Sequence, residues 1–65
     1  MVAEDDLYEP VRWIAGAVGL KGVLLDIYSL GPDCEEPFRM MAKVSTEHGV
    51  FDEHVKNLEP AKQPG

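Results

Sequence analysis

Residues 38–45 read Phe-Arg-Met-Met-Ala-Lys-Val-Ser, and this stretch is the clearest strand of the chain. Apolar side chains recur at every second position from Phe38 to Val44, and the positions between them are mainly polar. A period of two with one apolar face is typical of a half-buried β-strand. The stretch therefore predicts a sheet with one face on the core.

Residues 23–28 (Val-Leu-Leu-Asp-Ile-Tyr) predict a second strand of the same kind. Strict alternation places Val23, Leu25 and Ile27 on its inner face. The outer face then carries Leu24, Asp26 and Tyr28. Residues 31–37, with a proline near each end, predict the loop between these two strands.

Turn residues divide the rest of the chain. Residues 46–49 (Thr-Glu-His-Gly) predict a hairpin turn, with Gly49 at a positive φ. A third strand begins at Val50, and residues 52–58 predict a short helical turn capped by Asp52. Residues 10–18 combine helical spacing with strand-forming residue types. We predict a strand there, because the other strands require a further partner.

These elements predict a single domain spanning residues 1–65, with a folded core of about residues 7–59. We expect a flexible acidic N-terminus before this core and a proline-rich C-terminal tail after it. The predicted class is mostly β, a small SH3-like antiparallel barrel with a short C-terminal helical turn. The alternative is an α+β fold, with an N-terminal helix on a three-stranded meander.

The layout resembles the type II, plasmid-borne dihydrofolate reductases, which are small SH3-like barrels that assemble into tetramers around a central pore. The matching positions are turn and core residues: Val11-Arg12, Gly16-Ala17, Gly22, Tyr28-Ser29, Ser45, Glu47, Gly49, Val55 and Leu58-Glu59. The resemblance implies the fold and an origin in a mobile element. It implies no activity, because residues 50–53 (Val-Phe-Asp-Glu) replace the pore-lining Val-Gln-Ile-Tyr run and Trp13 occupies the place of the pore lysine.

Composition excludes several functions. The net charge of −6 and the scattered Lys and Arg residues argue against binding to nucleic acid. No apolar run is long enough to span a bilayer, and the acidic N-terminus is unlike a signal peptide. The only cysteine, Cys34, rules out an internal disulfide. We therefore expect a cytoplasmic protein that contacts neither membranes nor nucleic acid.

Few residues offer catalytic or metal-binding chemistry. The potential metal ligands are Asp33, Cys34, His48, Asp52, Glu53 and His54. They lack the tight, paired Cys and His spacing that zinc sites use. The carboxylates around Cys34 disfavour its thiolate, and Asp52 with Glu53 is more typical of a capped surface turn than of an acid/base pair. We predict no metal, no cofactor and no enzymatic activity.

Two surfaces are candidates for binding. The outer face of the two long strands would expose an apolar patch made of Leu24, Tyr28, Leu30 and Met41, which predicts self-association. Trp13 and Tyr28 would form a groove for an extended peptide, although Trp13 is equally well explained as a core residue. The leading interpretation is a non-enzymatic protein-interaction or self-assembling module. The alternative is a small-ligand-binding or enzymatic homo-oligomer with its site at a subunit interface.

Overall fold

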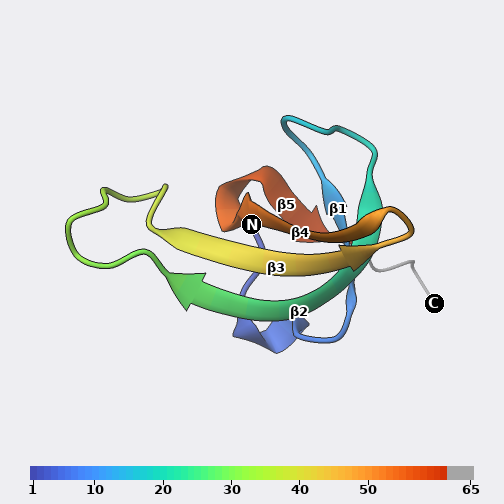
Figure 1. Cartoon of the computed structure of the whole chain (residues 1–65), viewed down its shortest axis with the longest axis horizontal. Coiled ribbons are helices and arrows are strands. Elements are labelled where there is room, and N and C mark those ends of the chain that lie inside the picture. The colour runs from blue at the N-terminus through green and yellow to red at the C-terminus, as the bar shows by residue number, and fades with distance from the viewer. Residues whose placement is uncertain (62–65) are drawn as a thin grey trace.

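A computed structural model describes residues 1–61, in which five antiparallel strands form one sheet in the order β4-β3-β2-β1-β5 (Figure 1). The strands are β1 (Pro10–Trp13), β2 (Lys21–Ser29), β3 (Met40–Thr46), β4 (Gly49–His54) and β5 (Leu58–Pro60). The only helical elements in this part of the chain are two 3-10 turns, η1 (Glu4–Asp6) and η2 (Val55–Asn57). The mostly β prediction is confirmed at this level. The sheet is open, with β4 and β5 as its edges.

The first predicted strand forms, but it is short. β1 ends at Trp13, and residues 14–20 are a loop that leads into β2. Val11 and Trp13 are buried, while Pro10 and Arg12 are exposed. Burial therefore alternates from residue to residue, as expected for a strand with one face on the core. The alternative of an N-terminal helix over residues 10–18 is therefore wrong.

A β-bulge in β2 changes which residues face the core. Leu24 pairs with Val44 and Asp26 pairs with Lys43, so Leu25 is an extra residue in the ladder. The bulge brings both Leu24 and Ile27 to the inner face, and Leu24 is 0% exposed. The predicted outward position of Leu24 is wrong, because strict alternation does not allow for the extra residue.

The acidic N-terminus is part of the folded unit. Val2 is buried in the core, and the Asp6 carboxylate accepts a hydrogen bond of 2.9 Å from the Ala3 N–H. The flexibility of the segment before residue 7 stays a prediction, although Val2 packs in the core and adds apolar surface that a small domain can bury. The predicted proline-rich tail lies outside the described residues from residue 62 onward. Pro60 itself ends β5, opposite Val11.

The predicted helical turn at residues 52–58 is shorter than expected. β4 continues to His54, and only Val55–Asn57 adopt the 3-10 conformation. Asp52 lies within β4 and caps no helix. The hairpin turn is confirmed, with Gly49 at a φ of 119°.

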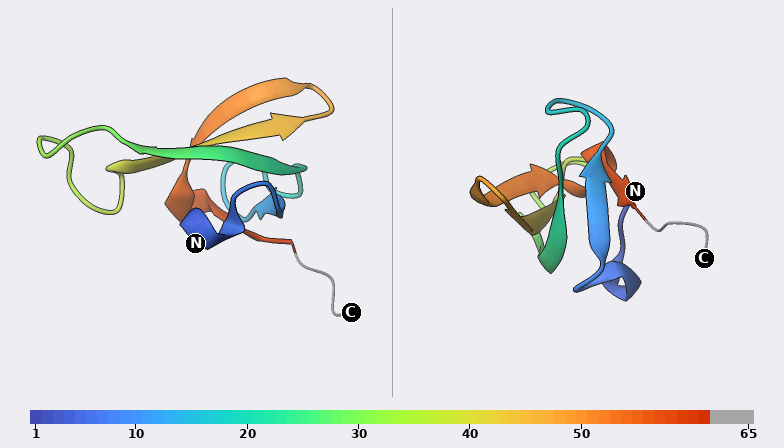
Figure 2. Two further views of the ribbon diagram at one scale, coloured as in Figure 1. Left: turned by 90° about the horizontal axis from the view of Figure 1, so that it is seen from below. Right: turned by 90° about the vertical axis from the view of Figure 1, so that its right-hand side faces the viewer.

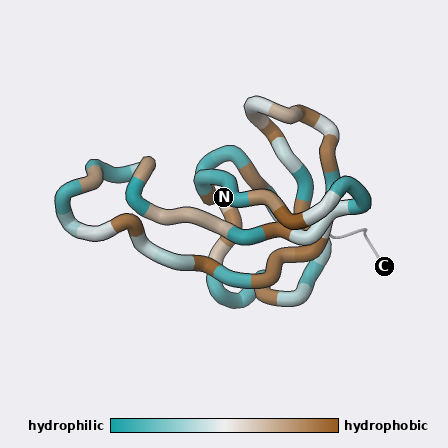
Figure 3. Tube along the Cα trace, viewed as in Figure 1, coloured by the Kyte–Doolittle hydropathy of each residue, from teal (hydrophilic) through white to brown (hydrophobic). Residues whose placement is uncertain are grey.

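The sheet is curved (Figure 2), and the core lies on one of its faces. The buried apolar residues are Val2, Val11, Trp13, Leu24, Ala42, Val44, Val55 and Leu58. The tube in Figure 3 shows apolar and polar residues interspersed along the strands. At Gly22 the backbone of β3 approaches so closely that a Cβ would lie 2.4 Å from the Ser45 carbonyl oxygen. Within residues 1–61, no helix is long and apolar enough to cross a membrane.

Candidate interaction surface

The free edge of β4 is the most distinctive surface of the molecule. β4 pairs with β3 on one side only, and Thr46 and Gly49 form the pair that closes the hairpin. The alternation of an antiparallel ladder then turns the backbone N–H and C=O of Val50 and Asp52 away from β3. In the described chain, no backbone hydrogen bond outside the ladders involves either residue. The edge therefore offers two residues that can pair with another strand.

A pocket of about 300 Å³ lies beside this edge. It separates β4 from the β1–β2 loop, and its lining is mostly apolar. The lining residues are Trp13, Ala17, Leu20, Phe51, Asp52 and Glu53. Phe51 is 42% exposed although its cross-strand partner Val44 is fully buried. An aromatic side chain beside an unpaired edge is thus left accessible at the margin of the core.

Glu53 fixes the position of β4 relative to β1. One carboxylate oxygen accepts a 2.8 Å hydrogen bond from the Trp13 indole N–H. The other oxygen accepts hydrogen bonds from the His54 backbone N–H at 2.9 Å and from the Asn57 amide at 3.2 Å. Burial raises the pKa of the Glu53 carboxyl, but these hydrogen bonds outweigh burial and hold the pKa below its ordinary value. Glu53 is therefore an ionised structural carboxylate and not a proton donor at neutral pH.

Charges alternate across the outer face of the sheet. Asp26 lies opposite Lys43 in the β2–β3 ladder, and Lys43 lies opposite Asp52 in the β3–β4 ladder. The row thus reads negative, positive, negative, and it ends with a carboxylate at the free edge. Partial desolvation of the hydroxyl, together with the charge and hydrogen bonding of Asp52 and the charge of Asp26, raises the pKa of Tyr28. Among residues 1–61, the row therefore ends in the Asp52 carboxylate with no cross-strand cation beyond it.

The residues predicted to form the self-association patch do not lie together. Leu24 is in the core. Tyr28 and Met41 are directly opposite each other in the β2–β3 ladder, and both are half-buried. Leu30 is 51% exposed in the loop after β2. Only the Tyr28–Met41 pair therefore remains on the outer face of the strands.

The predicted groove of Trp13 and Tyr28 is not formed. Trp13 is 3% exposed and faces the core, whereas Tyr28 belongs to the outer face of the sheet. The alternative interpretation of Trp13 as a core residue is confirmed. The indole contributes instead to one wall of the pocket beside β4.

The potential metal ligands are dispersed. His48 is exposed in the hairpin turn, and Cys34 lies in the β2–β3 loop. His54 packs edge-on against Phe38 with ring centroids 5.6 Å apart, and its Nδ1 is buried without a hydrogen-bond partner. Among residues 1–61, no three His, Cys, Asp or Glu side chains are placed to hold a metal ion.

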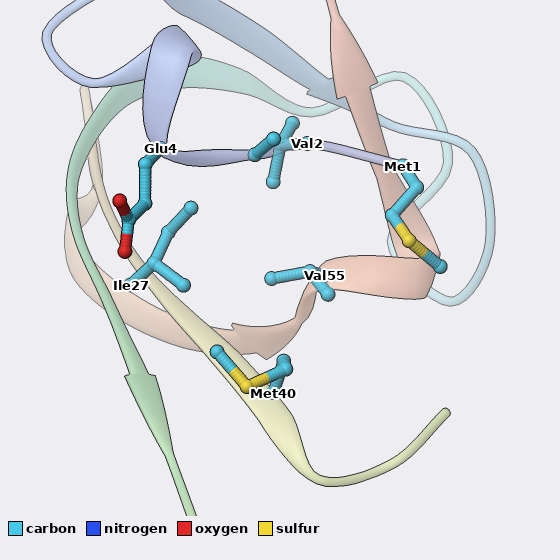
Figure 4. A pocket seen from close by; sticks show the side chains of 7 residues that line it. Met1, Val2, Glu4, Ile27, Met40 and Val55 are labelled. Atoms are coloured by element: carbon cyan, nitrogen blue, oxygen red, sulfur yellow. The ribbon is translucent and has the colours of Figure 1, made fainter. Parts of the chain in front are cut away.

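A second pocket, of about 240 Å³, lies under the N-terminal segment (Figure 4). Its lining residues are Met1, Val2, Ala3, Glu4, Ile27, Met40 and Val55. Figure 4 shows Val2, Ile27 and Val55 pointing into the same apolar space. This second pocket offers few polar groups to orient a ligand, so it is a less specific binding site than the edge of β4.

Comparison with protein-family models, with curated protein sequences and with solved structures finds no match to this chain. The site is therefore defined by its geometry. The sequence interpretation missed Val50 and Phe51 as exposed residues and Leu20 as a residue that lines the pocket. The order of two apolar residues, Val50 and Phe51, before two acidic residues is a local signal for an exposed strand. The position of that strand at the edge depends on the whole sheet.

Proposed function

We propose that this chain is a non-enzymatic protein-interaction module that binds an extended polypeptide segment at the free edge of β4. The observation that carries the proposal is the unpaired edge at Val50 and Asp52 beside the pocket of Trp13, Leu20 and Phe51. Exposed sheet edges are templates for pairing with a further strand. Recognition by strand addition takes its affinity from main-chain hydrogen bonds and its specificity from pockets for alternate side chains.

The strand order also supports an SH3-like arrangement as the finer description of the fold. β5 returns to pair with β1, and a 3-10 turn lies between β4 and β5. We propose that the resemblance to the type II reductases holds for the fold alone. Residues 50–53, which replace the pore-lining run of those enzymes, form the exposed edge here.

The expected affinity is modest. Two residues of the edge offer up to four backbone hydrogen bonds, each with a net contribution of about 0.5–1.5 kcal/mol. One apolar side chain in the pocket adds about 1.5–3 kcal/mol. Ordering the segment offsets part of this sum, which leaves a dissociation constant in the range of roughly micromolar to millimolar.

Substitution at Val50 tests the proposal. Val50→Pro removes the outward N–H, and an edge strand tolerates proline at such a position. Val50→Thr is the matched control, because it keeps the N–H and the β-branched shape. Peptides selected from a random nine-residue display library on the wild-type chain should bind Val50→Thr and lose binding to Val50→Pro. Equal binding to both folded variants, checked by circular dichroism, would refute strand addition at β4.

Self-assembly is the second candidate function, and the exposed apolar residues of the outer face support it. Val23 in β2 and Val50 in β4 are the two cross-strand partners of Ser45 in β3. Val23 is 40% exposed and Val50 is 55% exposed. Tyr28 and Met41 continue this face toward the other end of the strands. Met41→Glu should convert an assembly of this kind to monomer while the β signal persists. A wild-type chain that sediments as a monomer at high micromolar concentration excludes it.

Ligand binding at an oligomer interface is the remaining alternative, and the pocket beside β4 is near the lower size limit of small-molecule sites. A panel of nucleotide, nicotinamide, flavin and folate compounds discriminates this alternative. A compound that binds the folded state raises the melting temperature. The interaction module predicts no shift with any of them.

A further inference from the structure

We infer that the partner segment carries a lysine or arginine opposite Asp52, next to a large apolar residue that enters the pocket beside Phe51. This inference rests on the proposed function, because it specifies the chemistry of the segment that pairs with β4. It follows from two rows of side chains that cross the sheet and end at its free edge. One row lies on the outer face and the other on the inner face.

The outer row specifies the charge. Asp26, Lys43 and Asp52 are consecutive cross-strand partners, so the residues of this row alternate in charge. Opposite charges that face each other across strands stabilise a sheet, and like charges destabilise it. An added strand places one residue beyond Asp52 in this row. A cation at that position continues the alternation of charge. An anion there would be repelled both by Asp52 and by the chain's net charge of −6.

The inner row specifies the apolar residue. Leu24, Val44 and Phe51 are consecutive cross-strand partners on the core face. The next residue in this row lies over the pocket that Trp13, Ala17 and Leu20 line opposite Phe51. An aromatic or large aliphatic side chain fills such a space and covers the exposed part of the Phe51 ring.

Together the rows define a three-residue pattern. In an antiparallel continuation of the sheet, the partner reads, from its N-terminal side, a basic residue, a large apolar residue and a β-branched residue. These three residues face Asp52, Phe51 and Val50 in that order. The third preference follows because Val50 is exposed on the outer face, where a β-branched neighbour packs well.

A second copy of this chain fits the edge poorly. Side chains on one face pair only with side chains on the same face, so two β4 strands in antiparallel pairing place Asp52 opposite Asp52, Val50 or His54 of the other copy. None of these residues supplies the strong cation that the row lacks. Each copy also brings a net charge of −6 to the contact.

Peptide selection with charge variants tests the inference. Nine-residue random peptides displayed on phage are selected on the wild-type chain, on Asp52→Lys and on Asp52→Asn, with circular dichroism to confirm folding of each. Wild-type selections should be enriched in Lys or Arg directly before a large apolar residue, and selections on Asp52→Lys should shift to Asp or Glu. Synthetic wild-type-selected peptides should bind about two- to fivefold more weakly to Asp52→Asn and about five- to thirtyfold more weakly to Asp52→Lys.

Amide hydrogen exchange separates the two ways of failing. Peptides that protect the Val50 and Asp52 amides without a basic preference, or without a response to Asp52→Lys, would overturn the inference and leave strand addition intact. Selections in which no peptide protects these amides would overturn the proposed function and the inference with it. Protection of both amides in a peptide-free dimer would identify a second copy as the occupant and would also overturn the inference.

Discussion

Replacing Glu53 by glutamine tests the contact that joins the edge strand to the rest of the sheet. The carboxylate accepts hydrogen bonds from three donors, which are the Trp13 indole, the His54 backbone and the Asn57 amide. Glutamine has nearly the same shape but only one acceptor oxygen. Whichever way its amide is turned, at least one donor on the protein faces another donor. The substitution therefore removes acceptor capacity and charge without leaving a cavity.

The magnitude follows from this count. An unsatisfied buried donor costs about 1–3 kcal/mol, and Trp13 is 3% exposed. Because Glu53 itself is half-buried, part of the loss is recovered from water, and we expect Glu53→Gln to lower the free energy of unfolding by about 2 kcal/mol. A 65-residue chain has a total stability of roughly 3–10 kcal/mol. The melting temperature should fall by about 8–16 °C.

Thermal unfolding and urea unfolding, both monitored by far-UV circular dichroism, measure this loss of stability. Trp13 is the only tryptophan, so its fluorescence reports the environment of the same contact. Asp52→Asn is the matched control, because it removes a neighbouring but exposed carboxylate and should change stability by less than about 0.5 kcal/mol. A Glu53→Gln protein as stable as this control would refute the structural role of Glu53.

The effect should also depend on pH. The folded-state pKa of Glu53 is below its ordinary value of 4.5, so its contribution is fully present above pH 4.5. The contribution is lost as the pH falls through the lowered folded-state pKa, because both states then bind the proton. The stability difference between the wild type and Glu53→Gln should therefore narrow in acid. A difference that is the same at pH 7 and pH 3 would contradict the assignment.

Three further predictions test the fold. Leu24→Ala should cost about 2–5 kcal/mol, whereas Val23→Ala should cost less than about 1 kcal/mol; the reverse order in urea unfolding would disprove the bulge. Gly22→Ala should destabilise by at least about 1 kcal/mol, because its Cβ would lie 2.4 Å from the Ser45 carbonyl oxygen, and an unchanged melting temperature would contradict that close approach. Val2→Ala should cost about 1–2 kcal/mol, and no loss in thermal unfolding would support the expectation of a flexible N-terminus.

The strands could be predicted from the sequence because their signals are local. Alternation over residues 38–45 and the glycine at the end of the 46–49 turn depend only on neighbouring positions. The alternation locates β3 within two residues at its start and one at its end. In residues 10–18 the need for another strand decided the assignment correctly, although only Pro10–Trp13 adopt it.

The errors come from features that local patterns do not contain. One extra residue in β2 reverses the phase of alternation, and Leu24 moves from the predicted interface to the core. The hydrogen bond between Trp13 and Glu53 joins positions 40 residues apart. The burial of Val2 likewise depends on the space that other elements leave. The candidate site was missed for the same reason, because only the complete strand order makes β4 an edge.

An exposed edge strand promotes aggregation unless something limits its pairing, and β4 exposes both Val50 and Phe51. Asp52 is the residue on this edge that opposes self-pairing, through its own charge and through the acidity of the whole chain. In the proposed interaction the same carboxylate favours a cationic partner, so one residue would control both solubility and selectivity. Asp52→Asn should therefore increase self-association at high micromolar concentration. The same substitution should weaken the binding of basic peptides. Glu47→Gln, which neutralises an exposed carboxylate in the turn outside the edge, is the control for net charge. Sedimentation velocity over a concentration series measures both variants. Equal self-association of the two would show that net charge, and not the position of Asp52, keeps the edge unpaired.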